Sequence, residues 1–143
     1  MSATTATIEN PGTTLPQRRT ARGIGAVLAG LLAIVILSTA TDAVLHAAGV
    51  YPPFPQRMAE GLFLLATAYR IVYGVIGCYL TARLAPRRPL RHALILGGIG
   101  TVIATAGAAA MWEYGPGWYS IVIILISLPC AWAGARLHQA SAR

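Results

Sequence analysis

The chain has 143 residues, of which 56% are hydrophobic and only 10% charged, and its formal net charge is +7 at pH 7. A water-soluble domain needs about a quarter of its residues charged to cover its surface. The composition therefore excludes an ordinary soluble protein. It predicts one compact domain whose main partner is the lipid bilayer.

All eleven basic residues are arginines, and most of them lie between the apolar runs. Basic residues in such positions set the orientation of membrane proteins. This explanation is preferred to nucleic-acid binding, so no nucleic-acid partner is expected. The sequence contains no zinc, P-loop or dinucleotide-binding motif, and no cofactor is predicted.

Residues 1–22 are rich in Thr, Ala, Pro and Arg, so a disordered basic tail is expected there. Residues 23–48 then form a nearly unbroken apolar run, longer than the roughly 20 residues that span a hydrocarbon core. This run is predicted to be the first membrane-spanning helix. A cleaved signal peptide is the alternative, because Ser38-Thr39-Ala40 resembles a cleavage site after an apolar stretch.

Three further apolar runs follow in the chain, and prolines and glycines separate the runs because both residue types interrupt helices. The predicted spans are residues 58–82, 92–112 and 118–137, and residues 138–143 form a short polar tail. The predicted fold is therefore all-α, a four-helix transmembrane bundle covering residues 23–137.

The arginines are distributed unevenly over the two ends of this bundle. Nine lie before the first span, in the turn at residues 83–91 or near the C-terminus, whereas the other two loops hold only Arg57. Basic loops stay in the cytoplasm, so both termini are predicted to be cytoplasmic. Aromatic residues gather at the opposite interface, as expected for an aromatic belt. They are Tyr51, Trp112, Tyr114, Trp118 and Tyr119.

Small residues are predicted to hold the helices together, because lipid tails are as apolar as leucine and burial alone does not. They recur at short spacings in the first three spans: Gly23, Ala26, Gly30 and Ala33; Gly74, Gly77, Cys78 and Thr81; Gly97, Gly100, Ala104, Gly107 and Ala108. A glycine-rich face also suits a homodimer contact, and both uses stay open. Cys78 and Cys130 are expected to be reduced packing residues.

An acid and an arginine lie inside the first two spans. Asp42 and Arg70 are predicted to lie at neighbouring depths, and their side chains lean toward each other because the two helices are antiparallel. A lone charge there costs at least ~2.5–3.5 kcal/mol. We therefore predict an Asp42–Arg70 ion pair; the alternatives are a protonated Asp42 and an Arg70 that reaches water alone.

Other polar residues extend this candidate buried polar site. Ser38 and His46 share one helix face with Asp42, since the three are spaced four apart. Tyr69 and Tyr73 are expected near Arg70. A structural role that joins the first two helices is the preferred interpretation. A proton or ligand site is the alternative, because intramembrane ionisable residues are functional candidates.

Two further acids, Glu60 and Glu113, share the outer half of the bundle with Asp42 and His46. Their spacing matches no metal-ligand signature, so no metal site is predicted. The sequence also lacks a nucleophile–base pair, and the protein is not expected to be an enzyme.

Several short motifs resemble those of a family of small, four-span bacterial membrane proteins. They are Thr41-Asp42-x-x-Leu45-His46, Tyr51-Pro52-Pro53, Ala68-Tyr69-Arg70, Thr81-Ala82-Arg83-Leu84-Ala85-Pro86 and Pro129-Cys130-Ala131-Trp132. The resemblance covers about residues 23–137 and implies a multi-pass protein of the bacterial inner membrane. Because that family is uncharacterised, the resemblance implies no activity, substrate or catalytic residue.

The chain also invites comparison with the small multidrug exporters, which are four-span dimers with a glutamate near the middle of the first helix. Here the acid is Asp42, closer to the outer end, and Arg70 is available to neutralise it. The first hypothesis is therefore a non-catalytic accessory or structural subunit. The alternative is a small proton-coupled transporter that works as a homodimer.

Overall fold

The computed structural model describes residues 14–143 of the chain. Four long helices make up the fold, α1 (Thr14–Ala47), α2 (Glu60–Leu84), α3 (Pro89–Ala110) and α4 (Gly117–Ser141), with a short 3-10 helix η1 (Trp112–Tyr114) before α4. Residues 14–143 contain no strand, and all four helices are long and apolar enough to cross a membrane. The predicted all-α, four-helix transmembrane fold is confirmed.

Two predicted boundaries differ from the structure. The disordered tail expected for residues 1–22 is wrong from Thr14 onward, where α1 begins; residues 1–13 lie outside the described part. Helix α4 likewise continues to Ser141, through most of the polar tail expected at residues 138–143. Both extensions contain good helix formers, and lengthening an existing helix costs little. Apolar runs reveal only the part of a helix that lipid covers.

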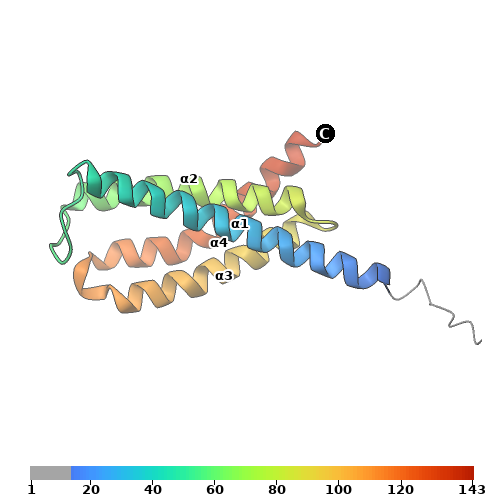
Figure 1. Ribbon diagram of the computed structural model, residues 1–143, viewed down its shortest axis with the longest axis horizontal. Coiled ribbons are helices and arrows are strands. Elements are labelled where there is room, and N and C mark those ends of the chain that lie inside the picture. The colour runs from blue at the N-terminus through green and yellow to red at the C-terminus, as the bar shows by residue number, and fades with distance from the viewer. Residues whose placement is uncertain (1–13) are drawn as a thin grey trace, which may run out of the picture.

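The helices run up and down, with α1 and α2 forming one hairpin and α3 and α4 the other (Figure 1). Helix α1 packs on α2, α2 on α4, α4 on α3, and α3 on α1. Both ends of the described chain lie at the same end of the bundle as the turn between α2 and α3. This end is called the termini end, and the opposite end, with the α1–α2 loop and η1, the loop end.

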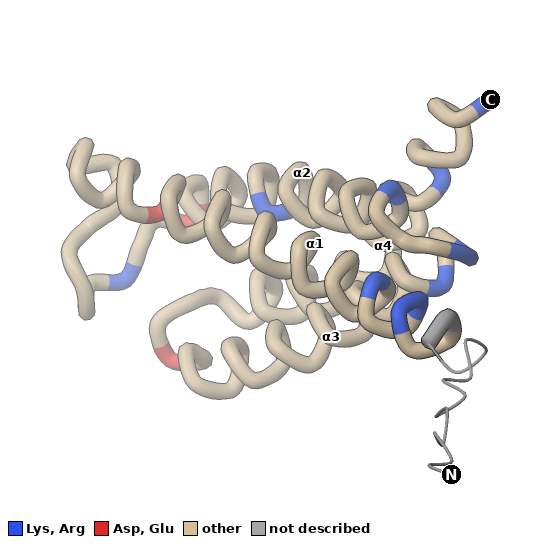
Figure 2. The backbone as a smooth tube through the Cα atoms, turned by 45° about the vertical axis from the view of Figure 1, so that its right-hand side comes forward, with Lys and Arg blue, Asp and Glu red and all other residues tan. Residues whose placement is uncertain are grey.

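Charge is segregated between the two ends (Figure 2). Most arginines lie at the termini end, in the first turns of α1, around the α2–α3 turn and in the last turns of α4. The three acids of the described chain, Asp42, Glu60 and Glu113, lie toward the loop end. The arrangement matches the arginine count made from the sequence.

The tightest packing lies toward the termini end. A buried cluster there consists mainly of small side chains: Val27, Cys78, Ala82, Ala93, Leu96, Ala131 and Ala135. The buried hydroxyl of Thr81 donates a hydrogen bond of 3.1 Å to the carbonyl oxygen of Ala26, which joins α2 to α1. Small side chains let the backbones approach closely enough for such contacts.

Glycines make the closest of these approaches. A Cβ atom added to Gly77 would lie only 2.7 Å from the carbonyl oxygen of Gly30, so α1 and α2 touch backbone to backbone there. On α3, a Cβ atom on Gly97 would lie 2.6 Å from the Cβ of Ala131 on α4. These contacts confirm the predicted seams. The α3 seam does not reach Gly107, however, where an added Cβ atom would meet nothing within 4 Å.

The two hairpins diverge toward the loop end (Figure 1). Helix α1 ends near Gly49, whose φ of 72° is a left-handed conformation that glycine adopts without a Cβ penalty. The loop after it carries Pro52, Pro53 and Pro55 and folds back over the space between the hairpins. The two hairpins are therefore farther apart at the loop end than at the termini end, where they pack closely against each other.

Candidate functional site

Arg70 of α2 and Asp42 of α1 form the ion pair predicted from the sequence. Nη2 of Arg70 donates to Oδ2 of Asp42 at 2.8 Å, and this is the one ion pair among residues 14–143. The two side chains are 29% and 31% exposed. The pair that was predicted to be buried is thus partly buried in the structure, because the hairpins have already diverged at this depth and leave space beside it.

Two tyrosines complete the surroundings of the Asp42 carboxylate. The hydroxyl of Tyr69 donates to Oδ1 of Asp42 and lies 3.2 Å from the hydroxyl of Tyr51, a buried side chain from the α1–α2 loop. Since Arg70 occupies Oδ2, both carboxylate oxygens are engaged. Asp42 is thus held by donors from a single neighbouring helix, α2.

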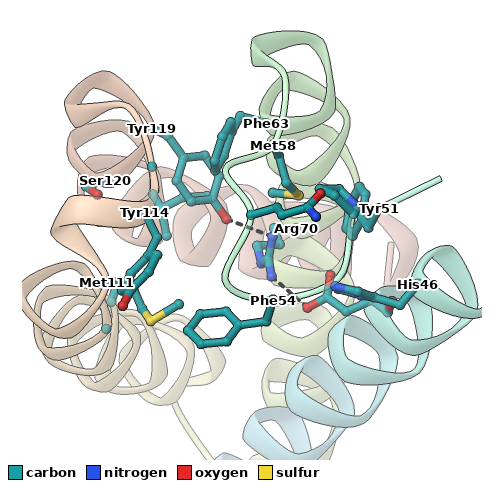
Figure 3. Close-up of a pocket in the computed structure, with 17 residues that line it drawn as sticks. His46, Tyr51, Phe54, Met58, Phe63, Arg70, Met111, Tyr114, Tyr119 and Ser120 are labelled. Carbon is teal, nitrogen blue, oxygen red and sulfur yellow. Dashed lines mark hydrogen bonds and ion pairs between the residues drawn. The ribbon is translucent and has the colours of Figure 1, made fainter. Parts of the chain in front are cut away.

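A third tyrosine links Arg70 to another helix (Figure 3). Nη1 of Arg70 donates to the hydroxyl of Tyr119, on α4, at 2.7 Å. The rings of Tyr69 and Tyr119 also lie 5.3 Å and 6.0 Å from the guanidinium carbon, within the range of cation–π attraction. One guanidinium group on α2 therefore contacts side chains of both α1 and α4.

The other predicted site residues lie around this network. Nδ1 of His46 lies 2.8 Å from the backbone oxygen of Asp42, so the ring bonds the main chain rather than the carboxylate. The hydroxyl of Tyr73 bonds Thr41 at 2.9 Å, one step removed from the ion pair. Ser38 lines a deeper cavity.

A cavity of about 420 Å³ opens beside the ion pair, between the two hairpins. Small-molecule sites usually enclose roughly 300–1,000 Å³. Phe54 reaches from the α1–α2 loop toward the other hairpin, and its ring centroid lies 5.1 Å from that of Tyr114 (Figure 3). Aromatic and thioether side chains line much of the wall: Tyr51, Phe54, Met58, Phe63, Met111, Tyr114 and Tyr119.

A smaller cavity of about 230 Å³ continues from the first toward the middle of the bundle. The two share Arg70, Ala104 and Ile123 as lining residues. Below Arg70 the lining is almost entirely apolar and includes both cysteines. Arg70 thus lies between an outer cavity that contains the ion pair and an inner cavity with an almost entirely apolar lining.

Both cysteines are free and buried, as expected of packing residues. Within residues 14–143, no three side chains of His, Cys, Asp or Glu gather closely enough to hold a metal ion. Glu60 and Glu113 are exposed and do not line the cavity beside the ion pair. The four outer-half residues considered from the sequence therefore do not converge on one point.

Sequence reasoning missed Tyr51 and Tyr119 as members of the site. Both were assigned to the aromatic belt at the membrane interface, where tyrosines are common. A belt tyrosine and a hydrogen-bonding tyrosine look alike in a sequence. Tyr119 lies 49 residues from Arg70, so only the packing of α4 on α2 reveals their contact.

Comparisons with protein-family models, with curated proteins and with solved structures found no match. The fold and the site define the class directly. Residues 14–143 form four helices able to cross a membrane, as in a multi-pass membrane protein, and an ion pair and a cavity lie between these helices.

Proposed function

We propose that the chain is a non-catalytic, multi-pass protein of the bacterial inner membrane that serves as an accessory or structural subunit. The observation that carries the proposal is the double engagement of Arg70, which bonds Asp42 on α1 and Tyr119 on α4. These bonds lie where the hairpins diverge and apolar packing is weak. A polar network is well suited to fix helix spacing there, because unpaired polar groups are costly in lipid.

The hydrogen-bonding pattern also supports a structural role over a catalytic one. A catalytic base must reach the proton that it removes. Both oxygens of Asp42 are occupied by Arg70 and Tyr69, and the guanidinium neutralises the carboxylate. The ring of His46, which also lines the cavity, bonds the backbone of its own helix.

A proton-coupled transporter acting as a homodimer is the second candidate. The observation that favours it is the cavity of about 420 Å³, because Asp42, His46 and Arg70 all line it. A ligand in this cavity would lie against the only ion pair of the described chain. Gly98 of α3, where an added Cβ atom would meet nothing within 4 Å, would be free for a contact with a second copy.

Flux measurements with Asp42→Asn distinguish the two candidates. We expect vesicles that contain the wild-type protein and the pH dye pyranine to behave like empty vesicles under a pH gradient, with or without tetraphenylphosphonium. Asp42→Asn should change nothing except the stability of the protein. Transport would instead be established by two results together. The wild-type protein would move protons only when the organic cation is present, and a folded Asp42→Asn protein would not move them.

The proposed orientation places the termini end in the cytoplasm, and it is supported by nine arginines near that end against Arg57 at the loop end. A cysteine in place of Ala59, in the exposed α1–α2 loop, should react with a membrane-impermeant maleimide in intact spheroplasts. A cysteine in place of Ala140, in the last turns of α4, should react only after permeabilisation. Labelling in the reverse order would refute the orientation. The native thiols are buried and provide little background.

A further inference from the structure

A groove at the termini end has no part in the ion-pair network. It has a volume of about 740 Å³ and runs between the first turns of α1, the turn after α2 and the start of α3. Four arginines line it: Arg19, Arg87, Arg88 and Arg91. Apolar side chains of α1 and α3 line most of the remainder, together with Thr20, Pro86 and His92.

The four arginines carry charge that no nearby acid offsets. All four side chains are exposed, and none takes part in an ion pair within residues 14–143. Figure 2 shows the described acids toward the opposite end of the bundle. Like charges gathered along one groove repel one another, so a bound anion would be favoured there.

Exposed apolar side chains adjoin the arginines. Ile24 is 58% exposed, Leu28 51% and Ile95 46%. They belong to the spanning parts of α1 and α3, whereas the arginines lie where those spans end. A soluble anion would contact only the arginines. A ligand with an anionic head and an acyl chain would contact both parts of the groove.

The groove depends on the helical extension of α1 beyond the span predicted from the sequence. Because the helix continues through Arg19, that side chain is held on a fixed element rather than on a disordered tail. Helices α1 and α3 approach closely at Gly23, where an added Cβ atom would lie 3.3 Å from the His92 ring carbon Cδ2. This approach places Arg19 and Arg91 along the same groove.

We propose that this groove binds an anionic phospholipid, with its phosphate among the arginines and an acyl chain along Ile24, Leu28 and Ile95. A guanidinium group matches the geometry of phosphate oxygens. Basic pockets between membrane helices bind anionic lipid head groups by this combination of contacts. The inference is independent of the role proposed for Asp42 and Arg70.

Native mass spectrometry of the purified full chain in detergent tests the ligand class. The probes are dioleoyl phosphatidylglycerol, dioleoyl phosphatidylcholine and glycerol phosphate. Phosphatidylglycerol is expected to bind on the order of tenfold more tightly than phosphatidylcholine, and glycerol phosphate more weakly than phosphatidylglycerol. Equal affinities for the two lipids would overturn the proposal. If glycerol phosphate bound as tightly as phosphatidylglycerol, the groove would be a site for free phosphate compounds, and the lipid assignment would be overturned.

A matched pair of variants tests the location. Arg87→Gln/Arg91→Gln is expected to weaken phosphatidylglycerol binding by on the order of tenfold or more. The control, Arg83→Gln/Arg143→Gln, removes the same charge from the same end but outside the groove, and should leave the affinity unchanged. Equal losses would show a general effect of surface charge and overturn the proposal. If the first variant does not fold, Arg87→Lys/Arg91→Lys replaces it and keeps the positive charge. This variant should still bind phosphatidylglycerol more weakly than the wild type does, because lysine lacks the planar guanidinium group. Unchanged binding would contradict the proposed site.

Discussion

Gly77→Ala is expected to destabilise the folded protein by roughly 1–3 kcal/mol or more, although alanine forms helices better than glycine. The added methyl group would lie 2.7 Å from the carbonyl oxygen of Gly30 and would also overlap the side chain of Ile34. The first of these neighbours is backbone, which cannot rotate away. Helices α1 and α2 must therefore separate, and the contacts along the whole seam weaken.

Unfolding of the purified protein by titration with sodium dodecyl sulfate, followed by tryptophan fluorescence, measures this loss. Gly25→Ala and Gly98→Ala are the matched controls, because an added Cβ atom meets nothing within 4 Å at either position. Both should leave the stability unchanged or raise it by up to ~1 kcal/mol through helix propensity. A Gly77→Ala protein as stable as these controls would contradict the backbone contact.

Arg70→Gln is expected to cost about 2–3 kcal/mol, less than the roughly 3–5 kcal/mol for breaking a fully buried pair, because both partners are about a third exposed. The substitution leaves the Asp42 carboxylate in the membrane with Tyr69 as its remaining partner. It also removes the hydrogen bond to Tyr119 that connects α2 with α4. The loop end should therefore loosen while the glycine contacts persist.

The same denaturation measurement applies to Arg70→Gln. Arg57→Gln removes an equal charge from the exposed α1–α2 loop and should change the stability by no more than about 0.5 kcal/mol. If Arg70→Gln destabilised the protein no more than this control does, the contradicted claim would be that the polar network holds the loop end.

Tyr119→Phe should destabilise the protein by about 1 kcal/mol, which lies between the losses for Arg57→Gln and Arg70→Gln. The substitution deletes one hydrogen bond and keeps the aromatic ring.

The two halves of the bundle are stabilised by different physical means. Toward the termini end, Gly77, Gly97 and their neighbours allow backbones to touch, and dispersion over small side chains holds the helices. Toward the loop end, the hairpins diverge, and Asp42, Arg70 and Tyr119 bridge the space. The cavity exists because polar side chains, rather than close packing, span this half.

The sequence predicted the four spans because their length and lack of charge leave lipid as the suitable solvent. It predicted the Asp42–Arg70 pair because an unpaired charge at that depth is costly and the two side chains lean toward each other. Neither inference requires knowing how the four helices pack. Both are confirmed by the structure.

The remaining features depend on packing and could not be predicted. Gly107 fits the same small-residue pattern as Gly97, yet only Gly97 meets α4 tightly, since α3 leaves the seam toward the loop end. The cavity follows from that divergence, and so does the partial exposure of the ion pair. Helix formation between Thr14 and Arg22 was missed because no apolar periodicity marks a helix that extends beyond the lipid.

The central claim is that Asp42 and Arg70 act together to hold the helices in place at the loop end. A double-mutant cycle with Asp42→Asn and Arg70→Gln, in the same denaturation assay, tests this claim most directly. The structure predicts a coupling energy of about 1–3 kcal/mol, above the average of ~0.6 kcal/mol for hydrogen bonds between membrane helices. The double variant should therefore be more stable than the sum of the single losses implies. Losses that add within about 0.3–0.5 kcal/mol would show that the two residues are energetically independent and would contradict the claim.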